Sequence, residues 1–164
     1  MMSKIILLCG KIGSGKTTLA KQLEKEKGFV CFSADEKMLK NYGEIHDKNE
    51  FREKLTECIS QIFDESLTLL KKGISVVLDF GFWTKKERDE AKKIFENFDV
   101  ELVYLKSDDV ENLKRISKRN TQKNAYYFDE ETYYFLMKKF EEPANENQVV
   151  LETEKSIEDF IIKQ

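Results

Sequence analysis

The sequence has 164 residues, of which 40% are hydrophobic and 36% are charged, and its formal net charge is −3. This length and balance predict a single α/β domain over residues 1–164, with an apolar core and a solvated surface. The acidic charge does not favour a protein built for general nucleic-acid binding, because such proteins usually carry a basic surface.

The chain shows no sign of a membrane segment or of a metal-binding cysteine motif. The apolar run at residues 5–9 is far shorter than the roughly 20 residues that a membrane-spanning helix needs, and no cleavage pattern of a signal peptide follows it. Cys9, Cys31 and Cys58 sit among apolar neighbours without metal-binding spacing, which is typical of small core residues in a reducing compartment. We therefore expect a cytoplasmic location and no membrane partner.

The hydrophobic pattern predicts strands that alternate with helices. Continuous apolar runs indicate buried strands, and apolar positions at spacings of three and four indicate helices. Ser33 with Glu36, and Thr84 with Glu87, have the spacing of capping boxes. In chain order the predicted elements are a strand at 4–9, a helix at about 15–25, a strand at 29–32, a helix capped by Ser33, a helix at 50–72, a strand at 74–78, a helix at 84–98, a strand at 100–105, helices at 109–119 and 131–140, a strand at 149–151 and a helix at 157–162.

This alternation predicts a mainly parallel sheet that helices cover on both faces. Ligands of such sheets bind at the carboxyl ends of the strands. The polar residues that follow the first three predicted strands are therefore the first candidates for a functional site.

A phosphate-binding loop follows the first predicted strand. Residues 10–17, GKIGSGKT, match G-x-x-x-x-G-K-[ST] between a buried strand and an amphipathic helix. Glycines let backbone N–H groups approach phosphates closely, and the helix N-terminus adds the positive end of its dipole. Lys16 supplies charge to the β- and γ-phosphates, and the Thr17 hydroxyl is placed to bind Mg²⁺. The predicted nucleotide-binding residues are Gly10, Gly13, Ser14, Gly15, Lys16, Thr17 and Thr18.

Two acids follow neighbouring predicted strands. Asp79 ends the third strand, where an acid orients Mg²⁺ in phosphate-loop enzymes, although an Asp that begins a turn has the same appearance. Asp35 follows the second strand, where it can take the proton of a hydroxyl acceptor or simply favour the dipole of the helix that Ser33 caps. The only histidine, His46, lies in a polar stretch, so a carboxylate is the expected base.

A basic segment covers residues 114–123. Arg115 and Arg119 lie four residues apart, and therefore on one face of a helix. Two guanidinium groups on one face can clamp a transferring phosphate. A solvated basic face at a helix C-terminus explains the spacing as well, and the two interpretations stay open at this point.

Several motifs together resemble one known group. They are the phosphate loop, Ser33-x-Asp35, the stretch LDFGFWT at 78–84, Arg115-x-x-x-Arg119-Asn120, and Phe140-Glu141-Glu142-Pro143. The chain resembles the small P-loop predicted kinases of the AAA-type ATP-binding family, relatives of zeta toxin, polynucleotide 5′-kinase and chloramphenicol phosphotransferase. The resemblance covers nearly the whole chain, and its aromatic run and spaced arginines are more specific than the phosphate loop.

The resemblance implies a three-layer α/β/α fold with a five-stranded parallel sheet in the adenylate-kinase-like order 2-3-1-4-5. It makes Asp35 the base, and it places Arg115 and Arg119 on a lid at about residues 115–130, with Arg119 near the nucleotide. The expected cofactors are ATP and Mg²⁺, with Thr17 and Asp79 as the metal site. Glu-Glu-Pro in place of the Glu-Pro-Pro of many relatives weakens a role for Glu141. Arg88 stands where relatives often have an arginine, and a helix-surface ion pair with a nearby acid explains it as well.

These expectations favour an ATP-dependent kinase that moves the γ-phosphate of ATP to a hydroxyl of a small molecule or of a nucleic-acid 5′-end. The net charge leans against long nucleic acid. The alternative is a regulatory ATPase without a small-molecule acceptor. A GTPase is not favoured, because the sequence lacks the guanine-reading motif of that class. Whether Phe82, Trp83 and Tyr126 line the acceptor pocket stays open, as do the acceptor itself and the oligomeric state.

Overall fold

The computed structural model describes residues 2–123 and 125–164, and residue 124, inside the expected lid, lies outside the described residues. Within those ranges, five strands form one parallel sheet in the order β2-β3-β1-β4-β5. The predicted sheet and its order are therefore confirmed. The strands are β1 (Lys4–Cys9), β2 (Val30–Ser33), β3 (Val76–Gly81), β4 (Asp99–Leu105) and β5 (Val149–Leu151).

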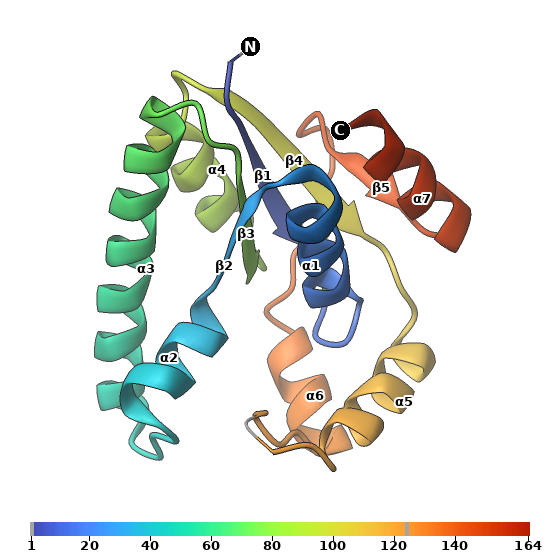
Figure 1. Ribbon diagram of the computed structural model, residues 1–164. Helices are drawn as coiled ribbons and strands as arrows, with labels where there is room; N and C mark the ends of the chain where they lie inside the picture. Colours follow the sequence, from blue (N-terminus) through green and yellow to red (C-terminus); the bar gives the residue numbers. More distant parts are fainter. Residues whose placement is uncertain (1, 124) are drawn as a thin grey trace.

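Helices cover both faces of this sheet, as Figure 1 shows. The α3 and α4 helices lie on one face and α1 and α7 on the other, while α2, α5 and α6 gather at the end to which the strands point. The three-layer α/β/α expectation is confirmed. The helices of the described ranges are α1 (Lys16–Lys27), α2 (Ala34–Tyr42), α3 (Lys48–Lys71), α4 (Lys85–Ile94), α5 (Asp109–Arg119), α6 (Glu130–Met137) and α7 (Glu154–Lys163).

The central strand β1 divides the core into two layers. Its residues 5–9 are fully buried, and alternate side chains point to opposite faces. Ile5 and Leu7 pack with Ile62 of α3 on one face, and Ile6 and Leu8 pack with α1 and α7 on the other. A strand that is buried on both faces must be apolar throughout, which is why the sequence IILLC shows no alternation.

Several boundaries differ from the sequence-based expectations by a few residues. The third strand runs on to Gly81, because it pairs with β1 and β2 as far as Gly81 and Asp79, so Asp79 lies within β3 and not beyond it. The α4 helix ends at Ile94, and α6 ends at Met137. Both helices are therefore shorter than predicted, whereas α7 is longer.

The two predicted capping boxes also differ from each other. At Thr84, the hydroxyl accepts from Glu87 N at 3.2 Å and the Glu87 carboxylate accepts from Thr84 N at 3.0 Å, so this box is complete. At Ser33, the hydroxyl accepts from Glu36 N at 3.2 Å. The Glu36 carboxylate turns instead toward Lys21, 3.8 Å from its Nζ. The capping box at Ser33 is therefore only half formed.

Candidate active site

The loop between β1 and α1 curls tightly at the carboxyl end of the sheet. Gly13 has a left-handed φ of 80°, and a Cβ there would lie 2.8 Å from the Asn112 carbonyl oxygen. A Cβ on Gly10 would lie 2.6 Å from the Ser14 hydroxyl. Only glycine fits at both positions, so the loop keeps a narrow backbone cradle that is suited to phosphate groups.

Lys16 lies inside this cradle. Its Nζ donates to Gly10 O at 2.9 Å, to Lys11 O at 2.8 Å and to the Ser14 hydroxyl at 3.3 Å. Desolvation lowers the pKa of Lys16, while the negative charges of Asp79 and Asp35 oppose this shift. The ammonium group therefore sits where the loop closes, within reach of both candidate acids.

Thr17 and Asp79 form the second part of the site. The Thr17 hydroxyl donates to Asp79 Oδ2 at 2.7 Å, although the two residues come from different elements, α1 and β3. Asp79 is nearly buried, at 9% exposure, and the adjacent Thr18 lies exposed on α1. A hydroxyl and a carboxylate in contact form the oxygen-rich donor set that Mg²⁺ prefers beside a phosphate.

Asp35 lies in the first turn of α2, directly after β2. Because β2 pairs with β3 and places Ser33 beside Asp79, the two acids lie at the same edge of the sheet. Asp35 is accessible to solvent, yet protein atoms crowd around it. This desolvation, together with the charge of Asp79, raises the pKa of Asp35, and Lys16 and Arg119 partly offset the rise.

The two arginines of α5 lie differently from the three lysines around them. Arg115 donates from Nη1 to Gly13 O at 3.1 Å and pairs with Glu111 at 3.4 Å. Arg119 stacks its guanidinium 5.8 Å from the centre of the Phe128 ring, and its Nε is buried without a hydrogen-bond partner among the described residues. The remaining cations of the segment are exposed: Lys114, Lys118 and Lys123.

The structure therefore separates the lysines of the segment from its arginines by their contacts. The lysines form a solvated surface, while Arg115 contacts the phosphate loop and Arg119 lies near the site. The charge of Arg119 lowers the pKa of both Lys16 and Asp35. The structure thus brings together Lys16, Thr17, Asp79, Asp35 and Arg119 from four separate elements.

One network beside the phosphate loop was not predicted from the sequence. Lys11 Nζ donates to Asp109 Oδ1 at 2.9 Å, and the hydroxyl of Tyr133 donates to the same oxygen at 2.7 Å. Asn112 Nδ2 donates to that hydroxyl at 3.0 Å. The network ties the loop to α5 and α6. No sequence pattern indicated this network. Lys11 holds a variable position of the motif and Asp109 an ordinary first-turn position of α5, and the contact with Tyr133 forms only because α6 packs beside α5.

Arg88 forms a buried ion pair, which rules out the helix-surface pair that was one of its two open explanations. Its guanidinium donates to both Glu146 oxygens, at 3.0 and 2.9 Å, and to Phe82 O at 2.9 Å. Arg88 and Glu146 are 1% and 8% exposed. Glu141 has a structural position as well, because its carboxylate accepts from Lys85 N at 2.9 Å at the start of α4.

The aromatic residues after Asp79 lie mainly in packing positions. Phe82 is 4% exposed and belongs to the core beneath α3 and α4. Trp83 packs against the buried cluster of Ile116, Tyr133 and Met137 from α5 and α6. Tyr126 differs from both, because its ring meets Phe51 of α3 edge-on, with 6.3 Å between the ring centres.

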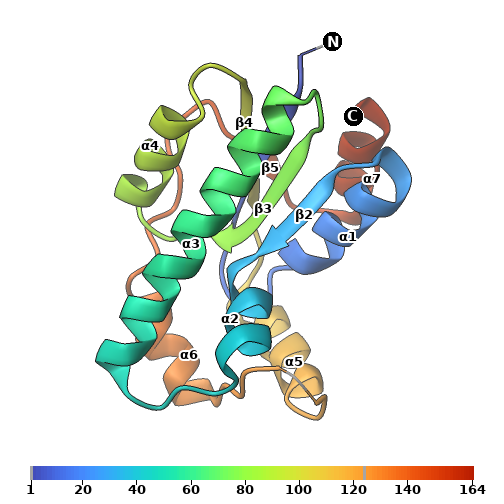
Figure 2. The same ribbon diagram turned by 60° about the vertical axis from the view of Figure 1, so that its left-hand side comes forward.

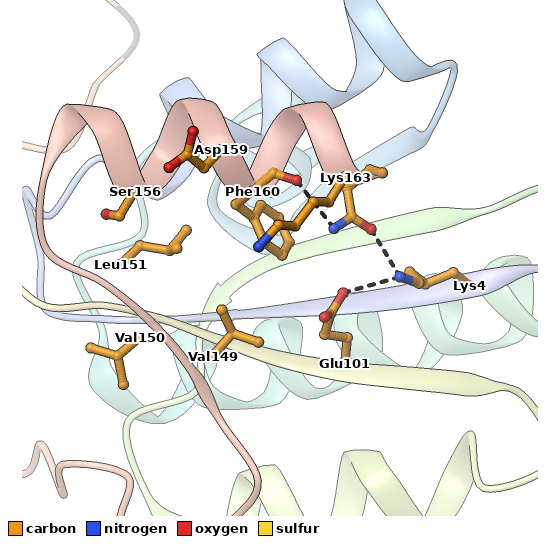
Figure 3. A pocket seen from close by; sticks show the side chains of 10 residues that line it. Lys4, Glu101, Val149, Val150, Leu151, Ser156, Asp159, Phe160 and Lys163 are labelled. Carbon is orange, nitrogen blue, oxygen red and sulfur yellow. Dashed lines mark hydrogen bonds and ion pairs between the residues drawn. The ribbon is translucent and has the colours of Figure 1, made fainter.

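A separate surface pocket of about 500 Å³ lies at the other side of the sheet (Figure 3). It is bounded by α7 and the β4–β5 edge, and Lys4 Nζ bonds there to Glu101 at 3.2 Å and to Gln164 at 2.9 Å. None of the predicted site residues lines it. The candidate active site is therefore the phosphate-loop edge and not this pocket.

Sequence comparisons assign the family. A model of the AAA domain family matches residues 5–143. This chain belongs to the AAA domain family. The shikimate kinase of Caldicellulosiruptor bescii is 26% identical over 126 residues, which cover 73% of this chain and 67% of that protein.

Solved structures share the fold across almost the entire chain. A gluconokinase from Sinorhizobium meliloti superposes with a TM-score of 0.67 at 14% identity, over 99% of this chain and 89% of that chain. The APS kinase CysC of Mycobacterium tuberculosis, in complex with AMPPNP and APS, has a TM-score of 0.65 at 15% identity, over 99% and 95%. The family expectation is confirmed, these structures show that the fold is shared, and the shikimate kinase relative supports the predicted enzyme class, an ATP-dependent kinase.

No helix within residues 2–123 and 125–164 has the length and apolar character needed to cross a membrane.

Proposed function

We propose that this protein is an ATP-dependent kinase that transfers the γ-phosphate of ATP to a hydroxyl group of an acceptor. The observation that carries the proposal is the hydrogen bond of 2.7 Å between Thr17 and Asp79, formed beside the Lys16 cradle. It joins a phosphate-binding loop to an acid at one sheet edge, and Asp35 lies on the neighbouring strand end. This arrangement offers binding for the nucleotide, a metal position and a base.

The roles proposed for the side chains follow from their chemistry. The backbone of the loop, with Gly10, Gly13, Ser14, Gly15 and Thr18, would hold the phosphates, and Lys16 would stabilise their charge. Thr17 and Asp79 would hold Mg²⁺, which neutralises phosphate charge when bound. Arg115 and Arg119 would approach the nucleotide from α5.

Asp35 would serve as the acceptor's base. A bond forms between the acceptor oxygen and the γ-phosphorus while the bridging bond to the β-phosphate breaks, so ADP departs with that electron pair. The acceptor proton passes to the Asp35 carboxylate. The raised pKa of Asp35 supports this role, because it strengthens the carboxylate as a proton acceptor.

We also propose that residues 1–164 act as one kinase domain and that the segment at about 115–130 closes over the nucleotide as a lid. The free thiols of Cys9, Cys31 and Cys58 support a reducing, cytoplasmic location. The acceptor is proposed as a small molecule. The kinases named above support it, because shikimate and gluconate are small hydroxyl compounds.

The regulatory ATPase without a small-molecule acceptor is the second candidate. The same loop and acid could hydrolyse ATP, and no contact in the structure by itself identifies an acceptor. The two candidates differ in one measurable property: only a kinase forms a labelled product other than inorganic phosphate.

The test uses γ-labelled ATP and Mg²⁺ with a panel of hydroxyl compounds. The panel holds gluconate, shikimate, aminoglycosides, chloramphenicol, nucleosides, nucleotide sugars and a 5′-hydroxyl oligonucleotide. We expect label on one class of acceptor, and its loss in Lys16→Ala and Asp35→Asn. Lys114→Ala, which removes an exposed lysine of the same basic segment, is the matched control and should retain transfer. Release of labelled phosphate alone, unaffected by every acceptor, would favour the regulatory ATPase.

A further inference from the structure

The loop between α5 and α6 is held in a defined shape by one side chain. Asn120 Nδ2 donates to Phe128 O at 2.7 Å, and Asn120 Oδ1 accepts from Phe128 N at 3.1 Å. These two bonds close the loop at its base. Tyr126 lies within this loop, two residues before Phe128, so its position depends on the two hydrogen bonds.

From this loop, the side chain of Tyr126 contacts the α3 helix. Its ring meets the Phe51 ring of α3 at 6.3 Å and 78°. Its hydroxyl is buried, and it has no hydrogen-bond partner in the part of the chain that the structure describes. Buried hydroxyls are nearly always paired in folded proteins, so an unpaired one next to a candidate site points to a group supplied by a ligand.

Two carboxylates and a guanidinium belong to the surroundings of this hydroxyl. Burial, and then the charges of Asp35 and Glu44, raise the pKa of Tyr126. On the same side, Arg119 Nε is a second buried donor without a partner, and its charge acts on Asp35 as well. Two donors without a partner among the described residues, the Tyr126 hydroxyl and Arg119 Nε, thus accompany the carboxylates of Glu44 and of Asp35, the proposed base.

The chemistry of these groups restricts what can lie between them. Carboxylates only accept hydrogen bonds and a guanidinium only donates them, while a hydroxyl does both. An anionic group would be repelled by Asp35 and Glu44, and an apolar group would leave the two donors unpaired. A small molecule with neighbouring hydroxyl groups can accept hydrogen bonds from the two donors and donate hydrogen bonds to the carboxylates. Its C–H groups can pack against Phe51.

We propose that Tyr126 binds the phosphate acceptor directly and that this acceptor is a small polyhydroxylated molecule, a sugar or polyol. The inference rests on the proposed kinase function and deepens it. The Tyr126 hydroxyl and Arg119 Nε donate to acceptor oxygens, and Asp35 accepts from the hydroxyl that is to be phosphorylated. Tyr126 is then a specificity-determining residue on the proposed lid.

The test compares wild type with Tyr126→Phe and Tyr127→Phe. The second variant is the matched control, because Tyr127 is the next residue of the loop and is 71% exposed. Acceptors are D-glucose, D-ribose, myo-inositol and glycerol, against ethanolamine and a 5′-hydroxyl oligonucleotide, with γ-labelled ATP. We expect label on a polyol. We also expect Tyr126→Phe to lower kcat/KM for that polyol at least tenfold, because a donor of the site is lost, with KM for ATP unchanged and Tyr127→Phe like wild type.

The melting temperature separates this effect from misfolding. Tyr126→Phe keeps the ring contact with Phe51 and removes only an unpaired hydroxyl, so its melting temperature should equal or exceed that of wild type. Equal kcat/KM for the polyol in wild type and Tyr126→Phe would overturn the contact. Label confined to ethanolamine or to the oligonucleotide would overturn the acceptor class and leave the kinase function standing.

Absence of label on every acceptor would contradict the kinase function and not yet this inference. The polyols are then titrated by calorimetry in the presence of a non-hydrolysable ATP analogue. Polyol binding that Tyr126→Phe weakens tenfold and Tyr127→Phe does not would support the inference without phosphotransfer. No polyol binding to wild type would overturn it.

Discussion

At the scale of single residues, the Thr17–Asp79 contact combines a surface hydroxyl with a nearly buried carboxylate. The contact spans 2.7 Å between α1 and β3. A buried carboxylate with only one side-chain donor keeps capacity for a cation. The pair therefore connects the proposed metal position with the rigid centre of the sheet.

We predict that Asp79→Asn mainly affects the metal requirement. An uncharged amide can still accept from Thr17 but attracts Mg²⁺ less strongly, so the Mg²⁺ concentration for half-maximal turnover should rise about 10- to 100-fold, the range found when groups around metals are lost. A Mg²⁺ titration of ATP turnover measures it. Thr17→Ser keeps the hydroxyl and should behave like wild type. An unchanged titration for Asp79→Asn would remove Asp79 from the metal site.

Asp35 gives a prediction about pH. Its raised pKa means that the folded protein holds the Asp35 proton more tightly than the unfolded chain does. The active carboxylate is lost as the pH falls through that raised value, so the acid limb of kcat/KM, which reports the free enzyme, should lie above the ordinary Asp pKa of about 4. A pH–rate profile tests this, and Asp35→Asn should lower kcat about 10²- to 10⁴-fold.

The stability of Asp35→Asn supplies an independent check on the same group. A raised carboxyl pKa means that ionised Asp35 reduces stability at neutral pH, and this cost disappears as the pH falls below the unfolded value. The Asn variant at pH 7 should therefore melt at the same temperature as wild type or higher. A lower melting temperature would show that Asp35 has a structural role, as the helix-dipole interpretation holds.

Sequence patterns predicted these residues to different degrees. Lys16 and Thr17 lie in one short motif whose geometry is local, so the sequence was sufficient to find them. Asp35 and Arg119 depended on the family resemblance, because spacing alone fitted ordinary helix ends as well. Tyr126 was left undecided, since the role proposed for it rests on a hydroxyl without a partner among the described residues, which no local pattern encodes.

At the scale of elements, the buried Arg88–Glu146 pair attaches α4 to the segment after α6. Arg88 binds both Glu146 oxygens and Phe82 O, and Phe82 has a left-handed φ of 46°. The guanidinium thus holds an unfavourable backbone turn directly after β3, next to Asp79. The sequence could not predict this pair, because its partners lie 58 residues apart.

We predict that breaking this pair from one side destabilises the protein strongly. Arg88→Met should lower the free energy of unfolding by about 3–5 kcal/mol, because it leaves Glu146 buried without its partner. The double variant Arg88→Met/Glu146→Leu should lose clearly less. Urea unfolding of both variants measures the difference, and equal losses would show that the charges are not coupled.

The same pair has a pH signature. The hydrogen bond from Arg88 lowers the pKa of Glu146 in the folded protein. Its contribution is therefore complete above the ordinary Glu pKa of about 4.3 and is lost as the pH falls through the lower folded value. Wild type should show this loss in acid, while the double variant should lack it.

At the scale of the whole molecule, a single tryptophan connects the phosphate loop with the proposed lid. Trp83 is the only tryptophan of the chain, and it packs against the cluster of Ile116, Tyr133 and Met137 from α5 and α6, as does Ile12 of the loop. Its surroundings should therefore change when nucleotide is bound and the lid closes.

We predict that ADP with Mg²⁺ changes the fluorescence of Trp83 with saturation at one site. The same titration should raise the melting temperature, because a ligand at 100 times its Kd stabilises the folded state by about 2.7 kcal/mol. Lys16→Ala should weaken both effects together. A rise in melting temperature without a change in fluorescence would show that nucleotide binds but that the segment around Trp83 stays in place.

The overall architecture was predictable in part from pattern alone. Alternating apolar runs and helical stretches predicted a covered parallel sheet, since strands buried on both faces have an unmistakable composition. The order of the strands came from the family resemblance, because periodicity carries no information about which strands pair. The boundaries of β3 and α4 were missed for a related reason. Strand pairing extended β3 to Gly81, and a turn at Phe95–Phe98 ended α4 earlier than predicted.

The start of β1 and the end of α7 lie together, since Lys4 Nζ donates to Gln164 Oε1 at 2.9 Å, and Figures 1 and 2 place both of them away from the loop between β1 and α1. A short peptide joining them, with new termini opened in the turn at Lys72 and Gly73, gives a circular permutant with an unaltered catalytic edge. The order in which the elements are synthesised could then be changed without changing the chemistry. The same placement lets an affinity tag or fused partner be attached at either end without obstructing the acceptor.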